Sequence, residues 1–224
     1  MRTEEFEVNG YKATVLIPEK PNGKWIWKTE FFTAFDQAER ALFDKGYTRV
    51  YYQVSDMYGS ARAIRLMRNF HKDLLKRFDF LEEQAILFGF SRGGLYAFNY
   101  ALYYPESVCK MYLDAPVLNL KSWPIKDSKE QKEFFKEYNV KEETFESFKD
   151  SPIDRLKEFF THKIPVLLIA GDSDEVVPFL ENGAIMSNKA KELNVELGLI
   201  LKKGCGHHPH SLEDVQPIVE FVER

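Results

Sequence analysis

Hydrophobic and polar positions alternate along this chain with two different periods. Near the start, EEFEVNGYKATVLIP holds two strand-like runs on either side of Asn9 and Gly10. An Asn-Gly pair between such runs is typical of a two-residue hairpin turn. Farther along, segments with apolar residues at helical spacing alternate with short apolar runs of strand length. The pattern therefore predicts an antiparallel hairpin followed by alternating strands and helices.

The expected elements form a regular series. WIWKTEFF is predicted to be a short strand that runs into a loop, and further strands are predicted over TRVYYQVS, QAILFGF, VCKMYLDAPV, IPVLLIAGD and VELGLILKKG. Helices are predicted over TAFDQAERALFDKG, ARAIRLMRNFHKDLLKRF, RGGLYAFNYALYYPES, PFLENGAIMSNKAKEL and LEDVQPIVEFVER. Strands that alternate with helices form βαβ units, so we expect one α/β domain over residues 1–224, with a mostly parallel sheet of about eight strands.

Residues 121–163 interrupt this series. The segment is heavily charged, carries paired Phe residues and lacks a strand pattern, yet it lies between two expected strands. Insertions after sheet strands commonly overhang the ligand crevice. We therefore interpret residues 121–163 as a small helical cap, with a solvated helical excursion against the domain as the alternative.

Composition narrows the classes of partner. A formal net charge of -4 gives no electrostatic reason to expect nucleic acid or an anionic membrane surface. The two cysteines, Cys109 and Cys205, cannot form a disulfide framework. The N-terminal segment has no apolar signal region and no stretch approaches membrane-spanning length. We expect a cytoplasmic protein without membrane contact.

The segment FGFSRGGL places Ser91 between glycines, after a strand and before a helix. Such a serine either caps the helix in a tight turn or forms a nucleophile elbow. A nucleophilic serine needs a base to take its proton and an acid to orient that base. Loops after two later strands supply these groups in the order that α/β hydrolases use. They carry Asp172, Asp174 and Glu175, and then His207, His208 and His210.

GFSRGG, GDSDEVVP and GCGHHPHSL resemble the nucleophile, acid and histidine segments of the α/β-hydrolase superfamily, and the resemblance covers essentially the whole chain. More narrowly, WIWKTEFF, SDMYGS, DAPV and KSWP resemble a bacterial group of esterase-like hydrolases, often grouped with esterases that act on carbohydrate-linked acyl groups. The resemblance implies an α/β-hydrolase fold, a small-molecule ester substrate and no cofactor.

Carried over residue by residue, the resemblance makes Ser91 the nucleophile. Asp174 is the acid, because the pattern G-x-x-D-x-x-V-P falls on Gly171, Asp174 and Pro178. His207 is the base, because it follows the last glycine of G-x-G-H.

Other polar residues leave alternatives open. Asp172 lies nearer the strand end and is expected to be structural, whereas Asp114 follows an earlier strand, where some hydrolases place the acid. His210 is expected to support its loop. Three histidines within four residues, with His208 between His207 and His210, also fit a metal site. Because no cysteine or carboxylate cluster accompanies them at ligand spacing, we expect no metal.

The oxyanion hole and the pocket are predicted from the neighbouring loops. The backbone N–H of Arg92, after the nucleophile, should be one oxyanion donor, and Trp27 or Lys28 should supply the second. Tyr58, Trp123 and Trp27 are expected to line the substrate pocket. The Arg92 side chain either pairs with a carboxylate, Asp56 or Asp114, or anchors an anionic part of the substrate.

These residues predict a serine hydrolase that cleaves carboxylic esters through an acyl-enzyme, acting on carbohydrate-linked or other small acyl substrates. Thioester hydrolysis and acyl transfer use the same triad and stay open. A catalytically silent scaffold that binds a ligand or partner is the alternative from another class. Peptidases of the prolyl-oligopeptidase kind share the triad but usually carry a large propeller domain, for which 224 residues leave no room.

Overall fold

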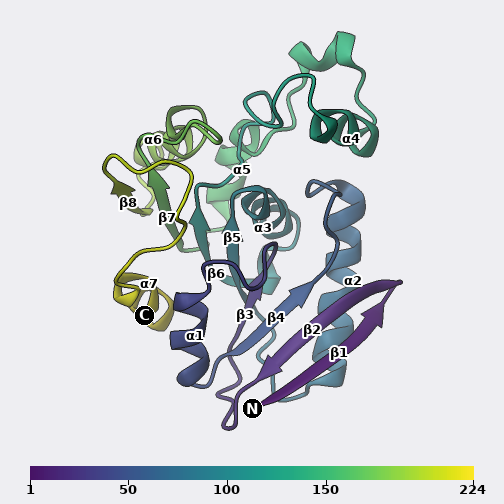
Figure 1. Cartoon of the computed structure of the whole chain (residues 1–224), viewed down its shortest axis with the longest axis vertical. Helices are drawn as coiled ribbons and strands as arrows, with labels where there is room; N and C mark the ends of the chain where they lie inside the picture. Colours follow the sequence, from purple (N-terminus) through teal and green to yellow (C-terminus); the bar gives the residue numbers. More distant parts are fainter.

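A twisted sheet with helices on both faces organises the chain, as described for residues 1–224 in a computed structural model (Figure 1). The sheet has eight strands in the order β1-β2-β4-β3-β5-β6-β7-β8. Their bounds are β1 Arg2–Val8, β2 Tyr11–Ile17, β3 Trp25–Lys28, β4 Thr48–Tyr52, β5 Ala85–Phe90, β6 Val108–Asp114, β7 Val166–Gly171 and β8 Gly198–Lys202. Strand β2 pairs antiparallel with β1 and β4, and the other pairs are parallel. The predicted α/β fold is confirmed.

Two helical layers bury the sheet. The helices are α1 Gln37–Asp44, α2 Ala61–Arg77, α3 Arg92–Tyr103, α4 Lys129–Tyr138, α5 Leu156–Thr161, α6 Gly183–Glu192 and α7 Gln216–Glu223. One face packs against α2, α3, α5 and α6, and the other against α1 and α7. Because both faces are covered, β5 and β7 are buried along their whole length and read as continuous apolar runs. None of the helices combines the length and apolar character that crossing a membrane requires.

The hairpin at the start of the chain follows from its turn residues. Val8 pairs with Tyr11, so Asn9 and Gly10 alone form the turn. Both have positive φ, 52° and 80°. A turn with positive φ at both central residues matches the twist of the flanking strands, which is why Asn-Gly favours it.

Residues 121–163 divide into two structurally different parts. Helix α4 stands beyond the end of the sheet to which β5 and β6 point (Figure 1). Its Phe134 packs with Phe145 in a small separate core that also includes Tyr58 and Leu95 from outside this segment. Helix α5, in contrast, lies in the main helical layer, where Phe159 stacks on Phe98 with ring centroids 4.6 Å apart. The role of this segment as a cap stays a prediction.

Candidate active site

Ser91 lies in a strained turn between the last residue of β5 and the first residue of α3. Its φ of 49° and ψ of -122° fall in a region that non-glycine residues rarely adopt. Its N–H donates to the carbonyl of Asp114 at 2.9 Å, and its carbonyl accepts from the N–H of Val117 at 3.0 Å. The neighbouring strand β6 and its following loop therefore hold the serine backbone in this conformation.

Two glycines permit the close approach of the loops around Ser91. A Cβ atom on Gly94 would lie 2.4 Å from Cβ of Pro116, in the loop after β6. A Cβ atom on Gly171, at the end of β7, would lie 2.2 Å from the carbonyl oxygen of Cys205. A side chain at Gly94 would push the start of α3 away from the loop after β6, and one at Gly171 would push the end of β7 away from the loop that carries His207.

The structure brings together the three residues that the sequence singled out. His207 Nε2 lies 2.9 Å from Ser91 Oγ, and His207 Nδ1 lies 2.7 Å from Asp174 Oδ2. Asp174 Oδ1 accepts hydrogen bonds from the N–H groups of Val176 at 2.8 Å and Val177 at 2.9 Å. All three side chains are buried. Ser91, His207 and Asp174 thus form one continuous hydrogen-bonded chain, with the carboxylate fixed by its own loop.

A second aspartate–histidine pair lies in the same loop region. His210 Nδ1 is 2.9 Å from Asp114 Oδ1. Asp114 Oδ2 accepts from the N–H of Ser211 at 2.7 Å and from the hydroxyl of Tyr112 at 2.6 Å. Burial and the neighbouring Asp114 raise the pKa of Tyr112 well above its usual value, so Tyr112 stays a donor. Asp114 forms no hydrogen bond with His207, so the geometry does not favour it as the acid.

Asp172 and His208 also lie near the triad without belonging to it. Asp172 Oδ1 accepts from the N–H of Gly204 at 2.7 Å, which ties the acid loop to the histidine loop. The ring of His208 is exposed and stacks on Phe35, with centroids 5.5 Å apart.

Imidazole nitrogens of the three neighbouring histidines lie within 4.8 Å of one another. Asp174 and Asp114 already engage His207 Nδ1 and His210 Nδ1. Because Ser91 Oγ engages the other nitrogen of His207, the three histidines could hold a cation together only at the expense of one of these contacts.

The Arg92 side chain lies in an internal ion-pair network. It contacts Glu30 Oε2 at 2.8 Å and Asp56 Oδ1 at 3.0 Å, so it pairs with Asp56 and not with Asp114. Burial opposes the charge of Arg92, but Glu30 outweighs this effect and the pKa of the guanidinium lies above its usual value. The side chain is 17% exposed, and both carboxylates hold it in place.

The predictions that Trp27 supplies an oxyanion donor and lines the substrate pocket are wrong. Trp27 lies inside β3, between β4 and β5, and its side chain is 1% exposed. Its ring packs edge-on against Phe70 and Tyr100 in the main core. Pairing on both sides of β3 engages the main chain, and the core encloses the side chain.

The prediction that Lys28 donates to the oxyanion is also wrong. Lys28 is the last residue of β3 and pairs with Phe88 of β5. Its buried ammonium group bonds to Glu39 of α1 and to the carbonyl of Ala34 at 2.7 Å. Burial lowers the pKa of Lys28 and raises the pKa of Glu39, although each partner partly offsets this effect in the other. The pair stabilises the contact between β3 and α1.

The sequence interpretation missed the loop that follows β3. Thr29 Oγ1 donates to the carbonyl of Gly93 at 2.7 Å, which fixes this loop against the start of α3. Phe31 has φ of 56° and is 41% exposed. The N–H groups of Glu30, Phe31 and Arg92 donate to no other group of the chain. The free main-chain donors of this loop, Glu30 and Phe31, therefore lie two to four residues beyond the predicted positions Trp27 and Lys28, because β3 continues to Lys28.

The predicted pocket residues Tyr58 and Trp123 meet under α4. Tyr58 is fully buried, and its hydroxyl donates to Glu133 Oε2 at 2.8 Å. Burial, together with this hydrogen bond, raises the pKa of Tyr58. Tyr58 thus anchors α4 and exposes no surface to a substrate, contrary to the prediction. Trp123 is half-buried, with its ring centroid 6.1 Å from that of Tyr58, and its substrate contact stays a prediction.

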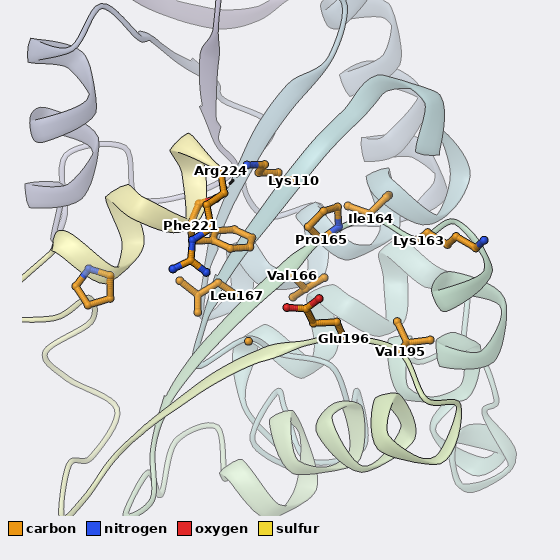
Figure 2. A pocket seen from close by; sticks show the side chains of 12 residues that line it. Lys110, Lys163, Ile164, Pro165, Val166, Leu167, Val195, Glu196, Phe221 and Arg224 are labelled. Carbon is orange, nitrogen blue, oxygen red and sulfur yellow. Dashed lines mark hydrogen bonds between the residues drawn. The ribbon is translucent and has the colours of Figure 1, made fainter.

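A cavity of 510 Å³ lies away from these residues (Figure 2). It is lined by residues of β6, β7, β8 and α7, among them Lys110, Leu167 and Phe221, and by residues of the segments that precede β7 and β8, among them Glu196. Lys110 Nζ donates to the carbonyls of Phe221 and Val222 at 3.0 Å. No residue of the hydrogen-bonded triad lines this cavity, so it is not part of the candidate site.

Comparisons with known proteins place the chain in a family. The model of the prolyl oligopeptidase family matches residues 46–224, whereas no curated protein matches the chain. Among solved structures, Pyrococcus horikoshii acylaminoacyl peptidase is 18% identical, with a TM-score of 0.70 over 92% of this chain and 37% of its own. A puromycin-hydrolyzing peptidase of Mycobacterium tuberculosis is 13% identical, with a TM-score of 0.74 over 99% and 37%.

A carboxylesterase from Lactobacillus plantarum is 14% identical, with a TM-score of 0.69 over 92% of this chain and 85% of its own. The chain spans only 37% and 41% of the first two peptidases it resembles. At these identities the likenesses show the α/β-hydrolase fold alone, and they do not confirm the narrower esterase-like group. The family model, however, matches most of the chain. The chain belongs to the prolyl oligopeptidase family, a family of serine hydrolases within the α/β-hydrolase superfamily.

Proposed function

We propose that this member of a serine hydrolase family cleaves carboxylic esters through an acyl-enzyme formed on Ser91. The observation that carries the proposal is the hydrogen-bonded chain Ser91 Oγ, His207 and Asp174, with contacts of 2.9 and 2.7 Å. A nucleophile, a base and an orienting acid in this order are the arrangement that acyl transfer requires.

Each member of the triad has a defined part in the proposed reaction. Ser91 Oγ attacks the acyl carbonyl while His207 Nε2 takes its proton. Asp174 accepts the hydrogen bond from His207 Nδ1, which holds the required tautomer and stabilises the imidazolium. His207 then gives the proton to the departing alcohol. Water, activated by the same histidine, hydrolyses the acyl-enzyme and releases the acid.

The oxyanion that forms in each step needs donors at fixed positions. The N–H of Arg92 follows the nucleophile, and the free N–H groups of Glu30 and Phe31 lie in the loop packed beside it. We assign the first donor to Arg92 and the second to Phe31, whose positive φ sets it apart from its neighbours. Loss of one such donor typically lowers the rate on the order of 100- to 1000-fold.

Ester and peptide substrates are supported by different observations. The carboxylesterase neighbour shares the fold over 92% of this chain and 85% of its own, and this likeness supports ester cleavage as the first candidate. Family membership favours cleavage of a peptide or aminoacyl amide as the second candidate. Within the first candidate, carbohydrate-linked and other small acyl groups suit the half-buried Trp123, since aromatic side chains commonly line such pockets.

A substrate panel tests the proposal. Wild type, Ser91→Ala and the matched control Ser147→Ala, an exposed serine of the cap region, are compared on p-nitrophenyl acetate through octanoate, acetylated sugars, an acyl thioester and aminoacyl p-nitroanilides. We expect turnover of esters by wild type and the control, and its loss in Ser91→Ala. Turnover of nitroanilides alone would establish the peptidase candidate instead. Inactivity on every substrate would contradict both.

A further inference from the structure

Three imidazole rings of the loop after β8 lie around one point. The ring centroids of His207, His208 and His210 are 4.8 to 4.9 Å from one another, which makes a nearly equilateral triangle. One nitrogen of each ring lies within 4.8 Å of a nitrogen of each other ring. A tetrahedral Zn²⁺ ion binds histidine nitrogens at about 2.1 Å and so holds them about 3.4 Å apart. Ring movements of about 1 Å therefore suffice to coordinate one ion.

Buried carboxylates bond to two of these rings through Nδ1. Asp174 contacts His207 Nδ1 at 2.7 Å, and Asp114 contacts His210 Nδ1 at 2.9 Å. Histidines that bind a metal usually donate their other ring N–H to a carboxylate, which fixes the ring and makes the coordinating nitrogen more basic. Both pairs are thus prepared to coordinate through Nε2. The two aspartates come from distant segments of the chain, which is why ligand spacing alone predicted no metal.

The remaining ring nitrogens have few competing contacts. His210 Nε2 forms no hydrogen bond within the chain. His208 is exposed, and neither of its ring nitrogens forms a hydrogen bond. His207 Nε2 has one partner, Ser91 Oγ at 2.9 Å. An ion bound by the three rings therefore displaces a single hydrogen bond, the one between the histidine and the serine.

Lys202 fixes the main chain of this loop. Its ammonium group donates to the carbonyls of Pro209 at 2.6 Å and Ser211 at 3.2 Å. These contacts hold the main chain on both sides of His210 without using its ring. The positive charge of Lys202 opposes a cation, but the carboxylates of Asp114 and Asp174 contact the rings directly and outweigh it.

We propose that His207, His208 and His210 bind one Zn²⁺ ion, and that this ion inhibits the hydrolase. Three histidine nitrogens and one water molecule provide the tetrahedral site that Zn²⁺ favours. Coordination through His207 Nε2 uses the lone pair that accepts the serine proton, so Ser91 loses its base. Binding of the ion depends on the histidine geometry alone, whereas the inhibition rests on the proposed function of Ser91.

Calorimetric titration with ZnCl2 tests the binding and needs no turnover. We expect wild type to bind one ion in the micromolar range. His208→Gln removes one ligand but keeps both aspartate–histidine pairs, and should weaken binding at least about tenfold. His162→Gln, which changes a histidine outside this loop, is the matched control and should bind like wild type.

The nearby thiol needs a control of its own. Cys205 is a free cysteine of the same loop, so Cys205→Ser should bind Zn²⁺ like wild type if the histidines form the site. No binding by wild type, equal binding by His208→Gln, or a loss of binding in Cys205→Ser overturns the proposal.

The rate at which a fluorophosphonate probe labels Ser91 tests the inhibition without a substrate. Zn²⁺ at about ten times its dissociation constant leaves about one tenth of the protein free of the ion, so labelling should slow about tenfold. EDTA should restore the rate, and Mg²⁺, which prefers oxygen ligands, should leave it unchanged. Zn²⁺ that binds without slowing the labelling contradicts inhibition through His207. A wild type that never labels contradicts the proposed function instead, and the calorimetry then decides the zinc site by itself.

Discussion

Two buried aspartate–histidine pairs lie side by side in this protein, and they share one hydrogen-bonding plan. In each, one carboxylate oxygen contacts a histidine Nδ1, at 2.7 Å for Asp174 and 2.9 Å for Asp114. The other oxygen accepts hydrogen bonds from main-chain N–H groups. For Asp174 these belong to Val176 and Val177, and for Asp114 the N–H belongs to Ser211 of the histidine loop. The pairs differ at the far nitrogen: His207 Nε2 meets Ser91 Oγ, whereas His210 Nε2 bonds to no group of the chain.

Under the proposed function, an aspartate–histidine contact does not by itself make a catalytic base, because only His207 also meets a serine hydroxyl. The group that lies next to Nε2 distinguishes the proposed base, His207, from His210, which supports its loop. Asp114 has a second connection to the site, because its carbonyl accepts the N–H of Ser91 at 2.9 Å. Its side chain holds the loop that carries His207, and its main chain holds the serine. We therefore propose that Asp114 positions both Ser91 and His207.

The largest difference between the two pairs is expected when the carboxylate of Asp174 is neutralised. Asp174→Asn should lower kcat about 10,000-fold, because an amide no longer holds the imidazole tautomer that accepts the serine proton. The measurement is kcat on the best p-nitrophenyl ester of the panel. Equal losses in Asp174→Asn and Asp114→Asn would show that the two pairs do not have different roles.

Neutralising the second carboxylate should have a smaller effect of a different kind. Asp114→Asn loosens the histidine loop, and displacement of a catalytic group by about 1 Å can lower the rate about 100-fold. We expect kcat to fall while KM stays unchanged, because no substrate contact is removed. An unchanged kcat in a variant that folds normally would show that Asp114 does not position the histidine loop for the reaction.

A third buried histidine shows what happens without a carboxylate. His71 contacts the Tyr100 hydroxyl at 2.6 Å and the Glu83 carbonyl at 2.9 Å. Burial lowers the pKa of His71 to about 4, even though the Glu83 carbonyl favours the charged form. The folded protein therefore binds this proton less readily than the unfolded chain does, and stability falls as the pH drops from about 6.5 to 4.

Urea unfolding measures this effect. Between pH 7 and pH 5, the His71 site alone should remove about 2 kcal/mol of the free energy of unfolding. A His71→Gln variant should be less stable at pH 7 but lose correspondingly less on acidification. The same pH dependence in both proteins would mean that His71 does not titrate in this way.

The mildest change removes one donor from the second pair. Tyr112→Phe deletes the hydroxyl that donates to Asp114 Oδ2 at 2.6 Å, while the N–H of Ser211 still donates to the same oxygen. We expect a loss of about 1 kcal/mol in stability and little change in kcat. A loss of kcat as large as that of Asp114→Asn would show that Tyr112, and not the loop contact, positions the site.

The parts of this site that depend on local sequence signals could be predicted from the sequence. Asn9-Gly10 predicts the hairpin, and the segments around Ser91, Asp174 and His207 follow strands whose ends must meet at one edge of a parallel sheet. The contact between Asp114 and His210 spans 96 positions, and nothing local indicates it.

The errors have the same origin. The length of β3, which removed Trp27 and Lys28 from the oxyanion hole, is set by pairing with β4 and β5. The burial of Tyr58 is set by α4, far along the chain. Such features depend on contacts between distant segments, so single-chain patterns do not reveal them.

Labelling with a fluorophosphonate probe tests the central claim most directly, because only an activated serine reacts. Intact-mass analysis of wild type should show a single adduct, located at Ser91 by peptide mapping. Ser91→Ala and His207→Gln should stay unlabelled, whereas Ser147→Ala should label like wild type. An unlabelled wild type, or an adduct that persists in Ser91→Ala, would contradict the assignment of Ser91 as the activated nucleophile.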